Sequence, residues 1–203
     1  MTSDLDLRER RELCDRFLEL GPDAPTLSGE WRTADLAAHL VVRERDPLGA
    51  PGILIGPLAG LTERRMRAQL DRHGYEGVVE RVRSGPPLGP MRIPAVRHAA
   101  NLVEFFVHHE DVRRANGETR REDRPDLDDE LWQLLGRMAP LMVRKSGVKG
   151  IRLRLVRPDG AERTVGSGDR EVVLRGHPSE LVLELYGRRA VAGVSYDGPA
   201  DAV

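Results

Sequence analysis

One stretch of the sequence places carboxylates and imidazoles among large apolar residues: EFFVHHED, residues 104–111. In an α-helix, residues at positions i, i+4 and i+7 lie on the same face. Glu104, His108 and Asp111 have this spacing, and Asn101 extends the polar stripe by one turn. Because the neighbouring residues are strongly apolar, the stripe does not resemble an ordinary solvent-facing surface. We therefore hypothesise that Glu104 and His108 bind a metal ion.

A catalytic zinc site takes three protein ligands and leaves one position for water or substrate, so a third ligand must come from another element. Residues 33–42 predict a helix with Thr33 as its N-cap, and His39 lies on the apolar face of that helix. His39, Glu104 and His108 are therefore the candidate ligands. The alternatives are a surface pair of Glu104 with His108, worth a few tenths of a kcal/mol, and a buried His39 with one hydrogen bond.

The composition is that of a globular protein without a strongly charged partner. The chain has 203 residues, of which 39% are hydrophobic and 32% charged, and its net charge is −1. This balance argues against a nucleic-acid partner, whose phosphates require an excess of positive charge. No signal peptide and no apolar run of about 18 residues is visible, so no membrane partner is expected. The lone Cys14, expected to be half-buried in a helix, suits a reducing cytosol and predicts a cytoplasmic protein.

The spacing of apolar residues changes from helical to alternating near Gly150. We predict helices over 3–20, 33–42, 58–71, 75–83, from Pro94 to about 116, and 127–145, with Pro140 kinking or ending the last one. We then predict a hairpin over 151–165, a strand at Glu171–Arg175, a short helix starting at 176–180 and a strand at Val191–Val194. We expect a helical domain over 1–148, a small α+β domain over 149–203, and an apolar loop over 46–60 that lines the mouth of the site.

The remaining histidines have simpler interpretations. His109 lies about 100° around the helix from His108 and is interpreted as a core or subunit-interface residue. His98 could lie near the metal ligands, whereas His73 and His177 fall at helix ends. The sequence has no Gly-x-Ser-x-Gly elbow, P-loop or dinucleotide-binding motif, which leaves serine and nucleotide chemistry without support.

Two motifs together resemble a known family. The stretch WRTADLAAHL, residues 31–40, followed by Glu104, His108 and Asp111, is similar to the metal-binding domain of mycothiol-dependent maleylpyruvate isomerases. The similarity covers roughly residues 5–145 and is greatest to an actinobacterial metal-binding subfamily. It implies a mainly α fold, a DinB-like four-helix bundle with a small sterol-carrier-like α+β appendage. It also implies that His39, Glu104 and His108 are metal ligands, usually of zinc.

The resemblance further implies an enzyme that uses mycothiol as a cofactor. Asp111 is implied to act close to the metal. Arg188, in the segment LYGRR at 185–189, is the nearest match to an arginine that holds an anionic substrate. The expected activity is a metal-dependent thiol transferase or isomerase acting on a small electrophile, as a monomer or homodimer. The alternatives are a metal-assisted hydrolase and a non-catalytic module that binds a metal or a small ligand.

Overall fold

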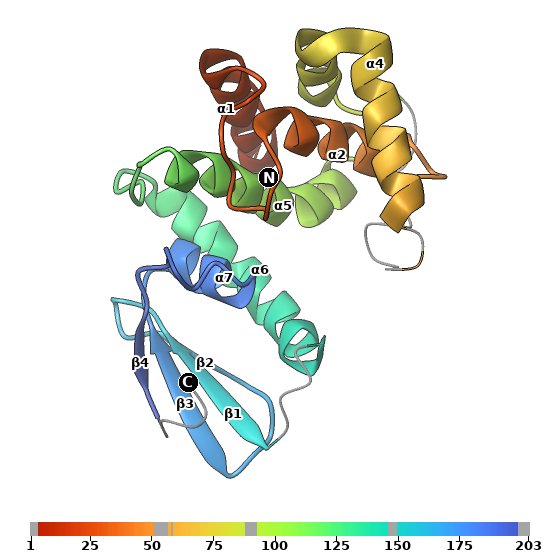
Figure 1. Cartoon of the computed structure of the whole chain (residues 1–203). Helices are drawn as coiled ribbons and strands as arrows, with labels where there is room; N and C mark the ends of the chain where they lie inside the picture. Colours follow the sequence, from red (N-terminus) through yellow and green to blue (C-terminus); the bar gives the residue numbers. More distant parts are fainter. Residues whose placement is uncertain (1–3, 51–56, 58, 88–92, 146–149, 199–203) are drawn as a thin grey trace. The chain divides into compact units, whose positions relative to one another are not determined.

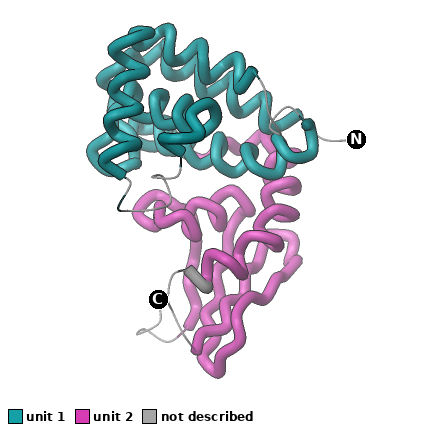
Figure 2. Tube along the Cα trace, turned by 90° about the vertical axis from the view of Figure 1, so that its right-hand side faces the viewer, with its two compact units in different colours: residues 1–119 teal, residues 120–203 magenta. Residues whose placement is uncertain are grey.

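A computed structural model describes residues 4–50, 57, 59–87, 93–145 and 150–198. The chain divides into two compact units, residues 1–119 and 120–203 (Figure 2). The division falls before the helix at 125–145. The boundary expected at 148/149 adjoins residues 146–149, which lie outside the described part, and stays a prediction.

The described part of unit 1 consists of α1 (Leu5–Leu20), α2 (Thr33–Arg45), α4 (Ala59–Ser84) and α5 (Pro94–Ala115). Helix α2 packs against α4, and α1 packs against α5 (Figure 1). The core they enclose is rich in leucine, valine and phenylalanine, including Leu13, Phe17, Leu36, Leu40 and Phe105. Helix α4 breaks at Gly74, whose φ of 64° suits a residue without a side chain. This break corresponds to the predicted gap between the helices at 58–71 and 75–83.

The start of α2 matters because this helix carries His39. The N-cap residue is Arg32, whose backbone N–H donates to the Asp35 carboxylate at 3.0 Å. The prediction of Thr33 as the cap is wrong by one residue: Thr33 lies inside the helix, and its hydroxyl donates to the carbonyl of Gly21. Cys14 is fully buried rather than half-buried, and burial raises the pKa of its thiol to about 12.

Unit 2 contains α6 (Pro125–Lys145), α7 (Pro178–Leu185) and a mixed four-stranded sheet among its described residues. The strands are β1 (Ile151–Val156), β2 (Glu162–Val165), β3 (Arg170–Arg175) and β4 (Ser195–Asp197), in the order β2-β1-β3-β4. Strand β1 pairs with β2 in an antiparallel manner, as the predicted hairpin requires, and with β3 in parallel. The prediction of the last strand is wrong, because it begins at Ser195 instead of Val191. Helix α6 continues through Pro140, so this residue does not end the helix, and a kink there stays a prediction.

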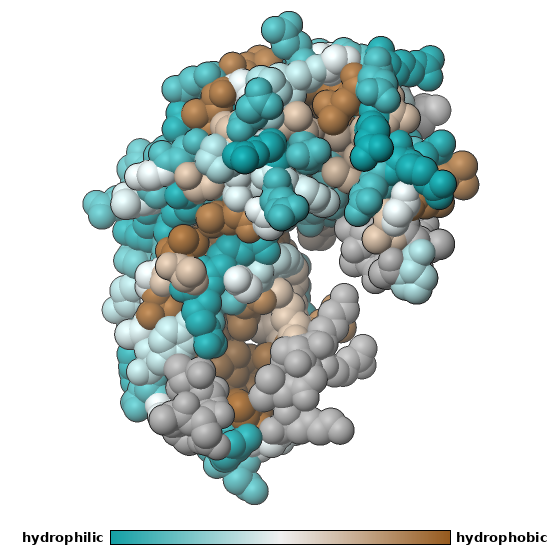
Figure 3. Space-filling view, in the orientation of Figure 1, coloured by the Kyte–Doolittle hydropathy of each residue, from teal (hydrophilic) through white to brown (hydrophobic). Residues whose placement is uncertain are grey.

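The mainly helical architecture with a C-terminal α+β part confirms the predicted fold class. None of the described helices is long and apolar enough to cross a membrane. Hydrophilic side chains cover most of the visible face of unit 1 (Figure 3). A hydrophilic surface side chain therefore says little about a functional site in this unit. A buried polar side chain says more, because a buried charge requires a partner. Of the apolar loop expected at 46–60, residues 51–56 and 58 lie outside the described part, so its position at the mouth of a site stays a prediction.

Candidate metal centre

The three predicted ligands meet where α2 faces α5. The Nε2 atom of His108 lies 3.3 Å from Oε1 of Glu104, and the Nε2 atom of His39 lies 3.5 Å from the same oxygen. The two imidazole rings are 5.4 Å apart between centroids, at an angle of 72°. One ligand atom from each of the three residues lies within 4.8 Å of the other two. The two residues predicted from their spacing on α5 and the histidine predicted from the apolar face of α2 thus form a single cluster.

The separations within this cluster suit a tetrahedral metal ion. Zinc lies about 2.0–2.2 Å from imidazole nitrogen and carboxylate oxygen, so two ligand atoms at a tetrahedral angle are about 3.3 Å apart. The observed N···O separations of 3.3 and 3.5 Å are close to this value. The donor set of two imidazoles and one carboxylate is also one that zinc accepts at catalytic sites. These residues therefore fit a metal ion without a large rearrangement.

His108 is oriented by Asp111, one turn further along α5. The Nδ1 atom of His108 lies 3.0 Å from Oδ2 of Asp111, which is fully buried. The buried carboxylate accepts the Nδ1 proton, so Nε2, which faces Glu104, is the nitrogen of His108 that a metal can bind. Burial alone would lower the pKa of His108, but the hydrogen bonds to Asp111 and Glu104 outweigh it and raise this pKa.

His39 has a different environment. Its ring lies 5.0 Å from the ring of Trp31, centroid to centroid, and burial lowers the pKa of its imidazole. Its Nδ1 atom is buried and has no hydrogen-bond partner within the described part of the chain. The polar interactions of His39 therefore concentrate on Nε2, the atom that faces Glu104. A neutral imidazole in this position suits metal ligation, which requires an unprotonated nitrogen.

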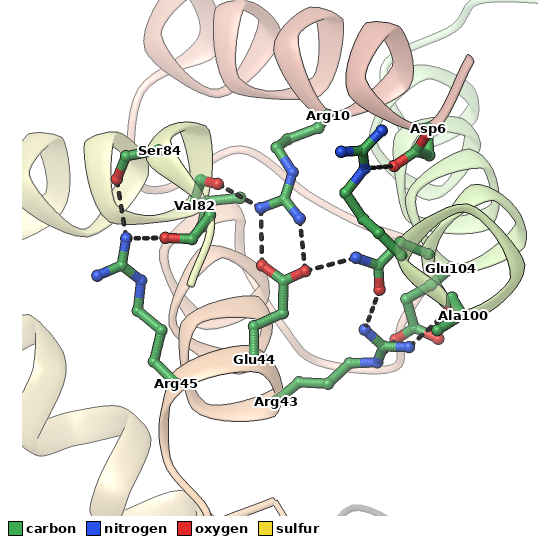
Figure 4. A network of polar contacts seen from close by, with 12 residues as sticks. Asp6, Arg10, Arg43, Glu44, Arg45, Val82, Ser84, Ala100 and Glu104 are labelled. Atoms are coloured by element: carbon green, nitrogen blue, oxygen red, sulfur yellow. Dashed lines mark hydrogen bonds and ion pairs between the residues drawn. The ribbon is translucent and has the colours of Figure 1, made fainter. Parts of the chain in front are cut away.

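Glu104 is held by positive charge and hydrogen bonds. Burial would raise the pKa of its carboxyl, but hydrogen bonds from His108 and His39 and the charge of Arg43 hold it well below its usual range. The Nε atom of Arg43 lies 3.2 Å from Oε1 of Glu104. Arg43 also donates to Oδ1 of Asn101 at 2.8 Å and to the carbonyl of Ala100 at 2.9 Å (Figure 4). Glu104 is therefore ionised and held in place.

The polar stripe continues into a buried network that the sequence analysis missed. Asn101 donates to Glu44 at 2.7 Å, and Glu44 accepts two hydrogen bonds from the guanidinium of Arg10 (Figure 4). Arg10 also donates to the carbonyl of Val82 at 2.6 Å. A signal was present, because Arg10 shares the core stripe of α1 with Leu13 and Phe17 at helical spacing. This network fixes Asn101, which in turn holds Arg43.

The other residues considered from the sequence have described contacts of their own. His98 is buried against Asp6, with 3.4 Å between Nδ1 and Oδ1, so the expectation that it lies near the ligands is not supported by its described contacts. His177 is the N-cap residue of α7 in unit 2 and lies 3.5 Å from Asp128. Arg188 also belongs to unit 2, where it donates to the carbonyl of Tyr186 at 2.6 Å. His73 lies next to the break in α4 at Gly74.

A second group with suitable spacing lies between α1 and α5. Ligand atoms of Glu9, Glu12 and His109 also come within 4.8 Å of one another. His109 is buried, and its Nδ1 atom lies 3.0 Å from Oε2 of Glu9. Glu12 accepts a hydrogen bond from Arg8 at 2.8 Å. The buried position of His109 agrees with its interpretation as a core residue.

Comparisons with known proteins give a shared fold. No family model matches the sequence, and no curated protein matches it. Among solved structures, a crystal structure of the mycothiol-dependent maleylpyruvate isomerase matches 98% of this chain and 91% of its own, with a TM-score of 0.61 at 16% identity. A histidine-to-alanine mutant of that enzyme matches over the same shares, with a TM-score of 0.62 at 15% identity. At this identity the likeness establishes the fold alone.

Proposed function

We propose that this protein is a metal-dependent enzyme of the thiol transferase or isomerase type, with His39, Glu104 and His108 as the metal ligands. The observation that carries the proposal is the convergence of two Nε2 atoms on one carboxylate oxygen at 3.5 and 3.3 Å. Zinc is the metal we favour, because the site offers nitrogen and oxygen ligands at tetrahedral separations. Bound there, zinc would supply an open position that favours the thiolate form of a small thiol.

The surrounding residues have separate tasks in this proposal. Asp111 keeps the Nδ1 proton on His108, so that Nε2 stays available. Arg43, whose Nε lies 3.2 Å from the same oxygen of Glu104 that both imidazoles approach, limits the rotation of that carboxylate. Arg188 is proposed to hold a carboxylate of the substrate, since a guanidinium suits such a group. An Arg188→Lys variant is the direct test of that last assignment, through a raised KM at unchanged metal content.

Mycothiol is the thiol we propose, because the structural neighbours are described as mycothiol-dependent and share the fold over nearly the whole chain. The substrate would be a small electrophile that the thiolate attacks. A cytoplasmic location, where such thiols stay reduced, suits the buried lone Cys14. The partners would thus be two small molecules.

The test is a thiol titration of cobalt-substituted protein. Mycothiol is expected to change the ligand-field spectrum of wild-type protein at one equivalent, because its sulfur would join the metal. His39→Ala, which lacks one proposed ligand, is the matched control and should give no such spectrum. If cobalt binds to wild-type protein and thiols leave its spectrum unchanged, the thiol proposal is wrong. A metal-assisted hydrolase or a non-catalytic binding module would then take its place.

A further inference from the structure

The segment between α1 and α2 forms a short closed loop, residues 25–32. Pro25 and Arg32 pair as an antiparallel bridge at its base. Inside it, the Thr26 hydroxyl donates to the carbonyl of Trp31 at 2.8 Å and accepts from the backbone N–H of Ser28 at 3.2 Å. Gly29, with a φ of 67°, makes the turn at the tip. The conformation of Ser28 is therefore fixed by the loop itself.

This loop is attached to α5 at the residue that orients His108. The hydroxyl of Ser28 donates to Oδ2 of Asp111 at 2.9 Å, and the same oxygen lies 3.0 Å from Nδ1 of His108. The backbone N–H of Leu27 donates to the backbone carbonyl of Asp111 at 3.2 Å. The carboxylate of Asp111 thus accepts one hydrogen bond from the loop and one from the imidazole. Its position depends on both.

The loop also contacts the second imidazole. Trp31, at the end of the loop, lies 5.0 Å from His39 between ring centroids, with an interplanar angle of 45°. One eight-residue segment therefore contacts His39 on α2 directly and His108 on α5 through Asp111. Neither Ser28 nor Trp31 belongs to the polar stripe on α5, so the spacing of residues on that helix gives no sign of them.

We infer that Ser28 is a positioning residue of the metal centre, acting through Asp111 on the tautomer of His108. The inference rests on the proposed metal site. With the Ser28 hydroxyl donating to Oδ2, Asp111 is held as a charged acceptor that favours the His108 proton on Nδ1. Nε2, which faces Glu104, is then the nitrogen available to a metal. Without the hydroxyl, the carboxylate can rotate in its buried setting, and the His108 proton can move to Nε2, where it opposes metal binding.

The first measurement uses metal-free protein and the ring nitrogens of His108, observed by ¹⁵N NMR above its pKa. Wild-type protein is expected to hold the Nδ1–H form, Ser28→Ala to hold a mixture of tautomers, and Ser28→Thr to return to the Nδ1–H form. Ser84→Ala removes a hydroxyl that donates to the carbonyl of Glu80 on α4 and serves as the control. An unchanged tautomer in Ser28→Ala overturns the inference. The tautomer can be measured whether or not the wild-type protein binds a metal. A wild-type protein that binds no metal would overturn the proposed function and leave this measurement valid.

The second measurement is zinc affinity, by competition with a chromophoric chelator. Removing a partner of a metal ligand typically weakens binding about 10- to 100-fold, and we expect Ser28→Ala, one bond further out, to lie at about tenfold. In an Asp111→Ala background the same substitution should change the affinity less than twofold, because its route of action is gone. Equal losses in both backgrounds would assign Ser28 a merely structural role and overturn the inference. If Ser28→Ala also lowers the melting temperature, the Ser28→Thr variant decides between the two roles. A hydroxyl that acts on His108 should restore the Nδ1–H form in this variant, and failure to restore it would overturn the inference.

Discussion

Two adjacent histidines of α5 serve opposite sides of the helix. His108 faces α2, where it shares an oxygen of Glu104 with His39 and is backed by Asp111. His109 faces α1, where it pairs with the fully buried Glu9 at 3.0 Å. Both sides bring imidazole and carboxylate groups to metal-compatible spacing, with two histidines and one glutamate on the α2 side and one histidine and two glutamates on the α1 side. The residue types therefore do not distinguish a metal centre from a structural pair.

The difference lies in how the nitrogen and oxygen atoms are used. On the α2 side, two imidazoles direct the same kind of nitrogen at one carboxylate oxygen, and a separate carboxylate holds the far nitrogen of His108. On the α1 side, Nδ1 of His109 is already satisfied by Glu9, and Glu12 is engaged by Arg8. A cluster in which the ligand atoms converge and a carboxylate holds the far nitrogen of one ligand ring is the one expected to take a cation.

Metal content gives the largest expected contrast between the two sides. His108→Ala removes one of three ligands, so the zinc affinity should fall by more than the roughly 100-fold that outer partners can cost. His109→Ala should retain one zinc per chain, as should His177→Ala in unit 2. Equilibrium dialysis followed by elemental analysis measures this. Zinc lost from His109→Ala and kept by His108→Ala would move the centre to the α1 side.

Stability should show the reverse contrast. In metal-free protein, His109→Ala leaves the carboxylate of Glu9 buried without the imidazole it contacts, which should lower the free energy of unfolding by about 1–3 kcal/mol. In His108→Ala, the buried Asp111 also loses an imidazole but keeps the hydroxyl of Ser28. Glu104, whose side chain is 22% exposed, keeps Arg43 and His39. The loss should therefore be smaller than in His109→Ala.

Urea unfolding measures this stability contrast. A Trp132→Phe background leaves Trp31 as the single tryptophan and lets its fluorescence report on unit 1 alone. A larger loss in His108→Ala than in His109→Ala would contradict the assignment of His109 to the structural role.

The α2 side was predictable from the sequence to a large extent, and the reason is geometric. Glu104, His108 and Asp111 are placed on one face by helix periodicity alone, and His39 is directed inward by the apolar face of its helix. The division into a helical part and an α+β part followed from the same periodicity and its change near Gly150, and the resemblance supplied the type of bundle. Resemblance to a family, rather than spacing, supplied zinc, mycothiol and the role of Arg188.

What the sequence did not give depends on contacts between distant segments. Ser28 and Asp111 are 83 positions apart, and Arg10 and Glu44 are 34 positions apart, so no local pattern connects them. Thr33 was a reasonable cap by residue type, but Asp35 accepts the hydrogen bond from Arg32 and moves the cap by one residue. Pro140 lies within α6 although proline removes a backbone donor, which residue preference alone does not anticipate.

The number of protons released on metal binding gives the smallest effect and the finest test of the α2 side. In metal-free protein, the hydrogen bonds to Asp111 and Glu104 overcome burial and raise the pKa of His108, whereas burial lowers the pKa of His39 and Glu104 is ionised. Below the raised pKa, His108 alone must lose a proton to bind zinc. The affinity should therefore fall about tenfold for each pH unit below that pKa and level off above it.

Calorimetry of zinc binding in two buffers with different protonation enthalpies measures this proton directly. We expect close to one proton per zinc below the pKa of His108 and fewer above it. Asp111→Asn removes the carboxylate that raises this pKa, so the fall in affinity should begin at a lower pH in that variant, while His109→Ala should leave the profile in place. Two protons per zinc would mean that His39 is also charged before binding, contrary to its burial against Trp31. If His108→Ala still binds zinc and still releases a proton, the ligand that titrates is not His108. The physical basis for distinguishing the two sides of α5 would then be gone.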